Sequence, residues 1–198
     1  MMNTIAEKAR GFILEPVETF QKSRTDEPGA VLAYLVALLL INAVFSAIVT
    51  AVVVNLMPFL AGFASGLPLP ALIFFAALAG GFVLTLVFAA WVHLWAYIFG
   101  GRKGIMQTAV AVIYGQTPRL LLGWIPFVGF LFTLWSLVLS ILGIRELQEL
   151  STLKAILVMA VAVLIPVILI ILLAAYLLIG SVTMTSVPSP VAGPFPLQ

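Results

Sequence analysis

Long uninterrupted runs of apolar residues dominate the chain. A transmembrane helix needs about 20 predominantly apolar residues, because the hydrocarbon core of a bilayer is roughly 30 Å thick and a helix rises about 1.5 Å per residue. Three runs clearly meet this requirement, at 29–56, 71–99 and 155–179. The sequence therefore predicts at least three membrane-spanning helices.

The apolar region 105–144 allows two interpretations, because Pro118 and Arg119 lie inside it and the segment 124–126 is typical of a turn. It forms either two short spans or one span preceded by a re-entrant or interfacial piece. Short loops rich in Lys and Arg stay on the cytoplasmic side of a membrane. With two spans, only Arg119 among the nine Lys and Arg residues falls outside. We therefore predict an all-α polytopic membrane protein with five transmembrane helices, the N-terminus inside and the C-terminus outside.

Three regions follow from this pattern: a charged cytoplasmic leader at 1–28, a five-helix transmembrane domain at 29–180, and an external tail at 181–198. Apolar residues recur in the leader at roughly helical spacing, which predicts one or two short amphipathic helices on the inner membrane surface. We favour a leader that anchors the bundle over one that binds a partner. Four prolines in the tail predict an extended conformation.

Composition agrees with a lipid environment. Hydrophobic residues make up 64% of the 198 residues and charged residues only 8%, whereas soluble domains average about 45–50% and about 25%. A water-soluble fold is thereby excluded. The net charge of +2, without a basic patch carrying interleaved aromatic residues, argues against nucleic acid as a partner. The chain has no cysteine, which removes disulfides and thiolate metal sites.

Polar residues inside the predicted spans are candidates for function, because each needs a hydrogen-bond partner or water. Asn42, Ser46 and Thr50 follow one another at a spacing of four and form a narrow polar stripe on the first span. Such stripes allow close helix packing and hydrogen bonds between helices. We favour packing as their role over a transport path.

His93 and Arg119 are the other intramembrane candidates. His93 could act as a proton relay or a ligand, but the predicted spans contain no Asp, Glu or Cys to complete a metal site. A structural hydrogen bond is therefore the favoured role of His93. Arg119 either reaches lipid phosphate or binds the carbonyls freed beside Pro118, or it forms an anion or headgroup site. Gln116 and Thr117 are expected to assist Arg119 in either case.

Enzymatic chemistry has little support in this set of residues. Intramembrane hydrolysis requires a nucleophile with a positioned base, or a pair of acids, and one histidine cannot supply either arrangement. The phosphate-binding GxxxxGK[ST] motif, the HExxH metal motif and the dinucleotide fingerprint are not found. We predict no catalytic residues, no metal site and no cofactor.

The order of features resembles the Yip1 domain family over roughly 11–179. The resemblance rests on Glu15, Pro16 and Phe20 in the leader, the segment 99–101 that ends the second span, Tyr114 and Pro118 in the third, and a Trp-bearing fourth span. It implies five spans with a cytoplasmic N-terminus and a short external C-terminus. Glu15, Pro16 and Phe20 become candidate contacts of the leader.

Eukaryotic members of this family act in vesicle biogenesis with small GTPases. The present sequence lacks their long acidic and proline-rich leader and their Asp-Leu-Tyr-Gly-Pro motif, so a GTPase partner is not carried over. The short leader is similar to that of prokaryotic members, which implies a multi-pass protein of a prokaryotic cell membrane.

Two functions remain open from the sequence. The first is a non-enzymatic membrane adaptor or organiser that packs against other membrane proteins, or against copies of itself, within the lipid bilayer. The second is a small transporter, channel or lipid-handling protein that uses the polar groups near Asn42, His93 and Arg119. The scarcity of intramembrane charge favours the adaptor.

Overall fold

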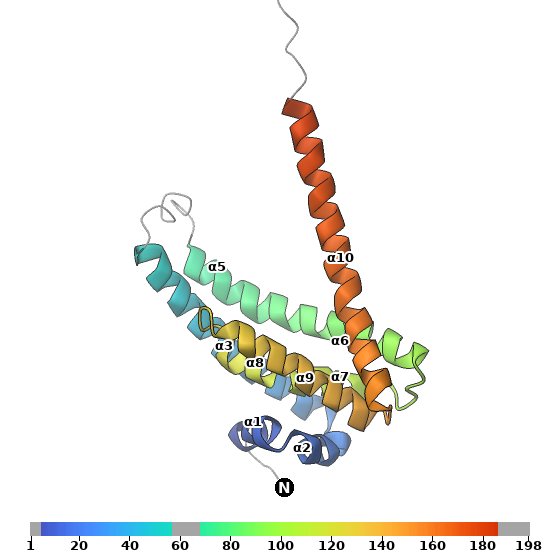
Figure 1. The fold of residues 1–198 in the computed structure, drawn as a ribbon. Coiled ribbons are helices and arrows are strands. Elements are labelled where there is room, and N and C mark those ends of the chain that lie inside the picture. Colours follow the sequence, from blue (N-terminus) through green and yellow to red (C-terminus); the bar gives the residue numbers. More distant parts are fainter. Residues whose placement is uncertain (1–4, 57–67, 186–198) are drawn as a thin grey trace, which may run out of the picture. The chain divides into compact units, whose positions relative to one another are not determined.

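A computed structural model describes residues 5–56 and 68–185 of the chain (Figure 1), with the backbone alone described at 180–185. The described residues form helices joined by turns, and no strand occurs among them. The chain divides into two compact units, Met1–Ala160 and Val161–Gln198. The predicted external link lies partly outside the described residues, at 57–67.

The leader forms two short helices, as predicted. Helix α1 spans Ile5–Leu14, helix α2 spans Pro16–Lys22, and a 3-10 turn follows at Ser23–Thr25. Helix α1 packs on α8 and helix α2 on α9, so the apolar side of the leader faces the bundle. These contacts join the leader to the bundle, and its anchoring role stays a prediction.

Two long apolar helices match the first two predicted spans. Helix α3 spans Pro28–Leu56, and the second helix runs through α5 (Leu69–Phe75), a π-helical segment (Ala76–Gly80) and α6 (Gly81–Ile98). Helix α3 packs along α5 and the π segment. At Gly81 a Cβ atom would lie 2.7 Å from Leu39 Cδ2. The glycine therefore permits the close approach of these two helices.

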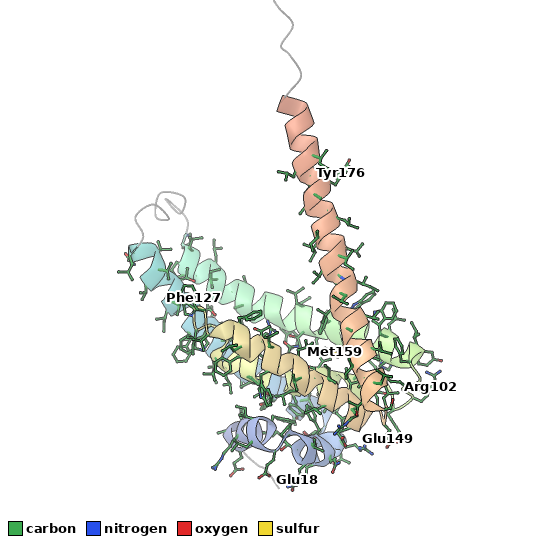
Figure 2. The ribbon with its side chains drawn as sticks, in the orientation of Figure 1. Glu18, Arg102, Phe127, Glu149, Met159 and Tyr176 are labelled. Carbon is green, nitrogen blue, oxygen red and sulfur yellow. The ribbon has the colours of Figure 1, made fainter. Side chains whose placement is uncertain are left out.

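The region 105–144 contains a broken helix, a turn and a long helix. Helix α7 spans Ile105–Gly115, α8 spans Thr117–Leu122 and α9 spans Gly129–Leu147. The predicted turn lies between α8 and α9, and Phe127 at its tip has φ 65° and is 99% exposed (Figure 2). The predicted third span is thus two short helices rather than one.

Four helices among the described residues are long and apolar enough to cross a membrane, at Pro28–Leu56, Leu69–Ile98, Gly129–Leu147 and Thr152–Ile179. Helices α7 and α8 have 11 and 6 residues, and neither reaches the length of a span alone. The count of five spans and the orientation of the termini therefore remain predictions.

Helix α7 lies at the centre of the first unit. Seven of its eleven residues are buried, including every residue from Val110 to Gly115, and it packs against both α6 and α9. A Cβ atom at Gly115 would collide with the Cα and Oγ atoms of Ser140 on α9. Small residues on α7 and α9 therefore allow their backbones to approach closely.

Helix α9 ends in a tight turn that leads into α10, which spans Thr152–Thr185. Glu149 adopts a left-handed conformation with φ 53°, and the Leu150 N–H donates to the Arg145 carbonyl at 3.1 Å. This hydrogen bond has the pattern of the Schellman motif, which satisfies carbonyls at the end of a helix.

In the second unit, helix α10 continues from Val161 and contains Pro166. Its large apolar residues between Leu164 and Ile179 are exposed on successive turns, as expected of a helix that faces lipid. The extended tail was predicted to begin at Ser181. This boundary is wrong, because the helix continues to Thr185. The apolar run 155–179 thus marks the hydrophobic part of a longer helix. The four prolines of the predicted tail lie outside the described residues.

Candidate functional site

Two side chains of the polar stripe on α3, those of Asn42 and Thr50, donate hydrogen bonds to backbone carbonyls. Asn42 Nδ2 donates to the carbonyl of Leu120 on α8 at 3.1 Å. Thr50 Oγ1 donates to the carbonyl of Ser46, one turn earlier in the same helix, at 2.8 Å. Asn42 is therefore the member of the stripe that links two helices, whereas the Thr50 side chain binds the backbone of α3 itself.

Side chains satisfy the break between α7 and α8. Pro118 lies in the first turn of α8, where the missing N–H of proline costs least. The Arg119 N–H donates to Ser136 Oγ on α9 at 2.9 Å, and Thr117 Oγ1 donates to the carbonyl of Tyr114 at 2.6 Å. Side-chain hydrogen bonds therefore stabilise the backbone where the helix is interrupted between α7 and α8.

The guanidinium of Arg119 binds the side chain of Gln116, one turn away. Arg119 Nη2 donates to Gln116 Oε1 at 2.5 Å, and Thr85 of α6 donates to the same oxygen at 3.4 Å. Arg119 is exposed, whereas Gln116 is buried. The Thr117 hydroxyl instead pairs with Tyr34 at 2.9 Å. Of the two residues expected to assist Arg119, Gln116 contacts its guanidinium and Thr117 supports the backbone.

His93 belongs to a separate polar cluster at the other end of α7. Its Nδ1 atom lies 2.9 Å from Thr108 Oγ1, which also accepts a hydrogen bond from Gln148 Nε2 at 2.8 Å. Gln148 further binds the carbonyl of Gly104 and the N–H of Lys103. His93 thus helps to hold the α6–α7 loop against the end of α9. The structure does not bring His93 together with Asn42 or Arg119 in one site.

The leader candidates divide between a turn and the protein core. Glu15 occupies the N-cap position of α2 without a capping bond from its side chain and is exposed, and its carbonyl accepts a hydrogen bond from Thr19 Oγ1 at 2.8 Å. Pro16 begins α2, where its fixed φ angle favours the helix. Phe20 is fully buried, with its ring centroid 4.8 Å from that of Phe12. Phe20 therefore acts in packing within this chain.

An ionic cluster that the sequence analysis missed joins the leader to α7. Lys8 Nζ pairs with Asp26 Oδ2 at 2.5 Å, and the Tyr114 hydroxyl donates to the same carboxylate oxygen at 2.6 Å. The Tyr114 ring stacks on Phe12 at a centroid distance of 4.6 Å and meets Tyr34 edge-on at 4.9 Å. Because Lys8 and Tyr114 lie 106 positions apart, no local spacing could indicate this contact.

A second group of charged residues ties the leader to the loops beside it. Glu149 pairs with Lys103 at 2.6 Å and with Arg24 at 2.9 Å, and Gln21 donates to Glu146 at 2.9 Å. The hydrogen bond from Lys103 lowers the pKa of Glu149 below its ordinary value, with a smaller contribution from Arg24. These contacts connect the leader, the α6–α7 loop and the α9–α10 turn on the exposed surface.

The candidate polar side chains are engaged mainly in contacts that join helices and turns. Asn42 and His93 bind groups on neighbouring helices, Arg119 binds Gln116 one turn away, and Thr50 binds a carbonyl of its own helix. Within residues 5–56 and 68–185, no three His, Asp or Glu side chains come close enough to hold a metal ion. The long apolar helices and their satisfied polar contacts define an α-helical, multi-pass membrane protein.

The model of the Yip1 domain matches residues 10–187 of this chain. The chain therefore belongs to the Yip1 domain family, as the leader and span features suggested. No curated protein and no solved structure matches the sequence.

Proposed function

We propose that this protein is a non-enzymatic adaptor or organiser of the Yip1 type, which acts by packing its helices against other membrane proteins. The observation that carries the proposal is the use of the polar intramembrane groups. Asn42, His93 and Arg119 each bind a neighbouring side chain or carbonyl of the same chain. Groups engaged in this way serve helix packing better than the conduction of a solute.

Helix α9 presents a surface for such packing. Its buried side carries Ser136, Ser140 and Gly143, whereas its opposite side exposes large apolar residues at spacings of three and four. That exposed side consists of Leu131, Leu134, Trp135 and Val138. An apolar face of this kind is suited to lipid or to another transmembrane helix.

Photo-crosslinking from this face tests the adaptor proposal. A photoreactive residue replaces Trp135 in the full chain in cells, and a second variant carries it at Val83, which is exposed on α6. A third variant carries the photoreactive residue at Val138, on the same side of α9 as Trp135. We expect one discrete protein adduct from position 135, the same adduct from position 138 and no protein adduct from position 83. Adducts with lipid alone at all three positions would contradict the proposal.

The alternative is a small transporter, channel or lipid-handling protein. The observation in its favour is the broken helix, where Arg119 is exposed beside the buried polar side chains of Gln116 and Thr85. Flux measurements with the purified protein in proteoliposomes separate the two functions. Selective flux that is lost in Asn42→Ala or His93→Ala would favour the alternative and weaken the adaptor.

We also propose five spans, with α7 and α8 together forming the third and the N-terminus inside a prokaryotic cell membrane. Support comes from the positions of Arg102, Lys103 and Lys154, which this topology places on one side with the leader. Because the chain has no cysteine, single cysteines at Arg102, Lys154 and Phe127 report topology cleanly. Only Phe127→Cys should react with an impermeant thiol reagent in intact cells. Reaction of Arg102→Cys and Lys154→Cys from opposite sides would overturn the five-span topology.

A further inference from the structure

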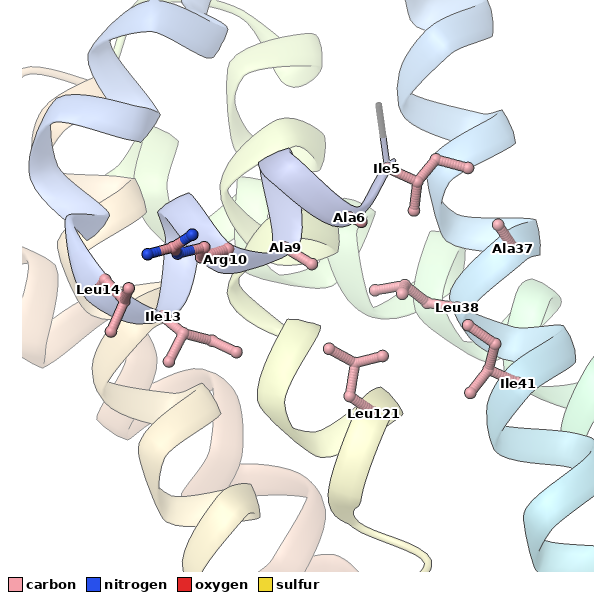
Figure 3. A pocket seen from close by; sticks show the side chains of 10 residues that line it. All are labelled: Ile5, Ala6, Ala9, Arg10, Ile13, Leu14, Ala37, Leu38, Ile41 and Leu121. Carbon is pink, nitrogen blue, oxygen red and sulfur yellow. The ribbon is translucent and has the colours of Figure 1, made fainter. Parts of the chain in front are cut away.

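An open apolar groove lies between the leader and the bundle. Its walls come from α1, α3 and α8, and its volume is about 690 Å3 (Figure 3). This volume lies within the roughly 300–1,000 Å3 typical of sites for small ligands. Nine of the ten residues that line it are apolar, among them Ile5, Ala37, Ile41 and Leu121. The groove therefore fits a hydrocarbon chain better than a polar solute.

Arg10 is the charged residue that lines this groove, and it lies on the α1 wall. Its side chain is exposed, and within the described part of the chain no carboxylate pairs with it. The other basic residue of α1, Lys8, is already paired with Asp26. A molecule with an acyl chain and an anionic headgroup would complement this groove, because the chain suits the apolar walls and the anion suits the Arg10 guanidinium.

The position of the groove along α3 also suits a lipid. Helix α3 has 29 residues, about 43 Å at helical rise, whereas the hydrocarbon core is roughly 30 Å thick. The helix thus has several residues more than it needs, and its first turns can extend beyond the hydrocarbon on the leader side. Ala37 and Ile41 follow those turns, near the depth where headgroups meet acyl chains.

We propose that this groove binds one anionic phospholipid from the surrounding bilayer, with an acyl chain between α1 and α3 and the phosphate held by Arg10. Arginine suits this role, because its planar fork of N–H donors matches the oxygens of a phosphate. The bound lipid fills the space between the leader and the bundle and links α1 to the membrane. This site is distinct from the α9 face assigned to protein partners.

Native mass spectrometry of the full chain in mild detergent tests the site with dioleoyl phosphatidylglycerol and dioleoyl phosphatidylcholine. We expect tighter binding of phosphatidylglycerol, and a loss of about tenfold or more in Arg10→Gln, the scale of a charged hydrogen bond. Arg10→Lys should retain part of this affinity. Lys22→Gln is the matched control, since Lys22 is an exposed leader cation paired with Glu18 away from the groove. Equal losses in Arg10→Gln and Lys22→Gln would overturn the proposal.

Filling the groove supplies a second test. Ala37→Phe and Ala6→Phe each place a ring in the space from opposite walls, and both should weaken phosphatidylglycerol binding while the protein keeps its thermal stability. Glycerol phosphate, which has no acyl chain, should not compete. Competition by glycerol phosphate would show that the site binds an anion without an acyl chain. A change of oligomeric mass in these variants with unchanged lipid binding would make the groove an interface between copies. Either result would overturn the proposal.

Discussion

The ring of Phe20 in the leader lies directly against the backbone of Gly143 on α9. A Cβ atom at position 143 would lie 2.8 Å from both Cε1 and Cζ of the ring, and 3.1 Å from the Cα of Ala111 on α7. Phe20 is fully buried, so its ring has no free space to move into. One glycine therefore allows the leader, α7 and α9 to meet.

Gly143→Ala should destabilise the protein by overpacking, on the order of 1–3 kcal/mol, because neither the Phe20 ring nor the α7 backbone can yield freely. Thermal unfolding in detergent measures the effect. Gly80→Ala is the control, since a Cβ atom there meets nothing within 4 Å. The control should be neutral or slightly more stable, because alanine favours a helix over glycine. Equal stability of both variants would contradict the close packing at Gly143.

Asn42→Leu should lower stability by about 1 kcal/mol or more. The substitution removes the hydrogen bond to the Leu120 carbonyl and adds a branched side chain where α3 meets α8. Asn55→Leu is a matched control, because Asn55 is exposed and its one hydrogen bond among the described residues goes to the Ala51 carbonyl of its own helix. Unfolding curves of the two variants in the same detergent give the comparison. If Asn42→Leu is no less stable than Asn55→Leu, the contact with α8 contributes nothing.

Tyr114→Phe should cost more stability than Tyr34→Phe. The Tyr114 hydroxyl donates to the Asp26 carboxylate and accepts from Lys8, and hydrogen bonds to charged groups contribute about 1.5–3 kcal/mol. The Tyr34 hydroxyl pairs with Thr117, which still binds the Tyr114 carbonyl when Tyr34 is changed. Tyr34→Phe should therefore cost at most about 1 kcal/mol. The reverse order in thermal unfolding would show that the ionic cluster does not hold the leader.

The stability of the fold should decrease as pH is lowered, in part because the Glu149 carboxylate becomes protonated. Lys103, and to a lesser degree Arg24, lower the pKa of Glu149 in the folded protein. Because the pKa of Glu149 is lowered in the folded protein, its full contribution to stability is present at every pH above the ordinary pKa of a glutamate. This contribution is lost as the pH falls through the lowered pKa. The melting temperature of Glu149→Gln should therefore depend less on pH between pH 6 and about pH 3 than that of the unchanged protein. Lys22→Gln, which removes a cation from a different ion pair, should leave the Glu149 component unchanged. If the melting temperatures of the unchanged protein and of Glu149→Gln depend on pH in the same way, Glu149 does not contribute to the pH dependence of stability.

The sequence by itself determined where the long helices lie. The limits of α3 and of the second helix differ from the predicted runs by at most two residues, because the length of an apolar run is a local property that the bilayer thickness selects. That the leader is helical followed from the helical spacing of its apolar residues, which left open whether it forms one helix or two. The turn near Trp124 followed from the local preferences of proline.

Only the tertiary structure decided which faces and side chains meet. The polar stripe marked one face of α3, but a local pattern cannot name the partner of that face, so the sequence could not show that α7 is central or that Asn42 binds the Leu120 carbonyl. The predicted third span consists of two short helices, and Ser136 of α9 and the Thr117 hydroxyl satisfy the break beside Pro118. Contacts such as Lys8 with Tyr114 join residues 106 positions apart. They exist only once the leader and the helices have packed, because packing alone sets the rotation and register of each helix.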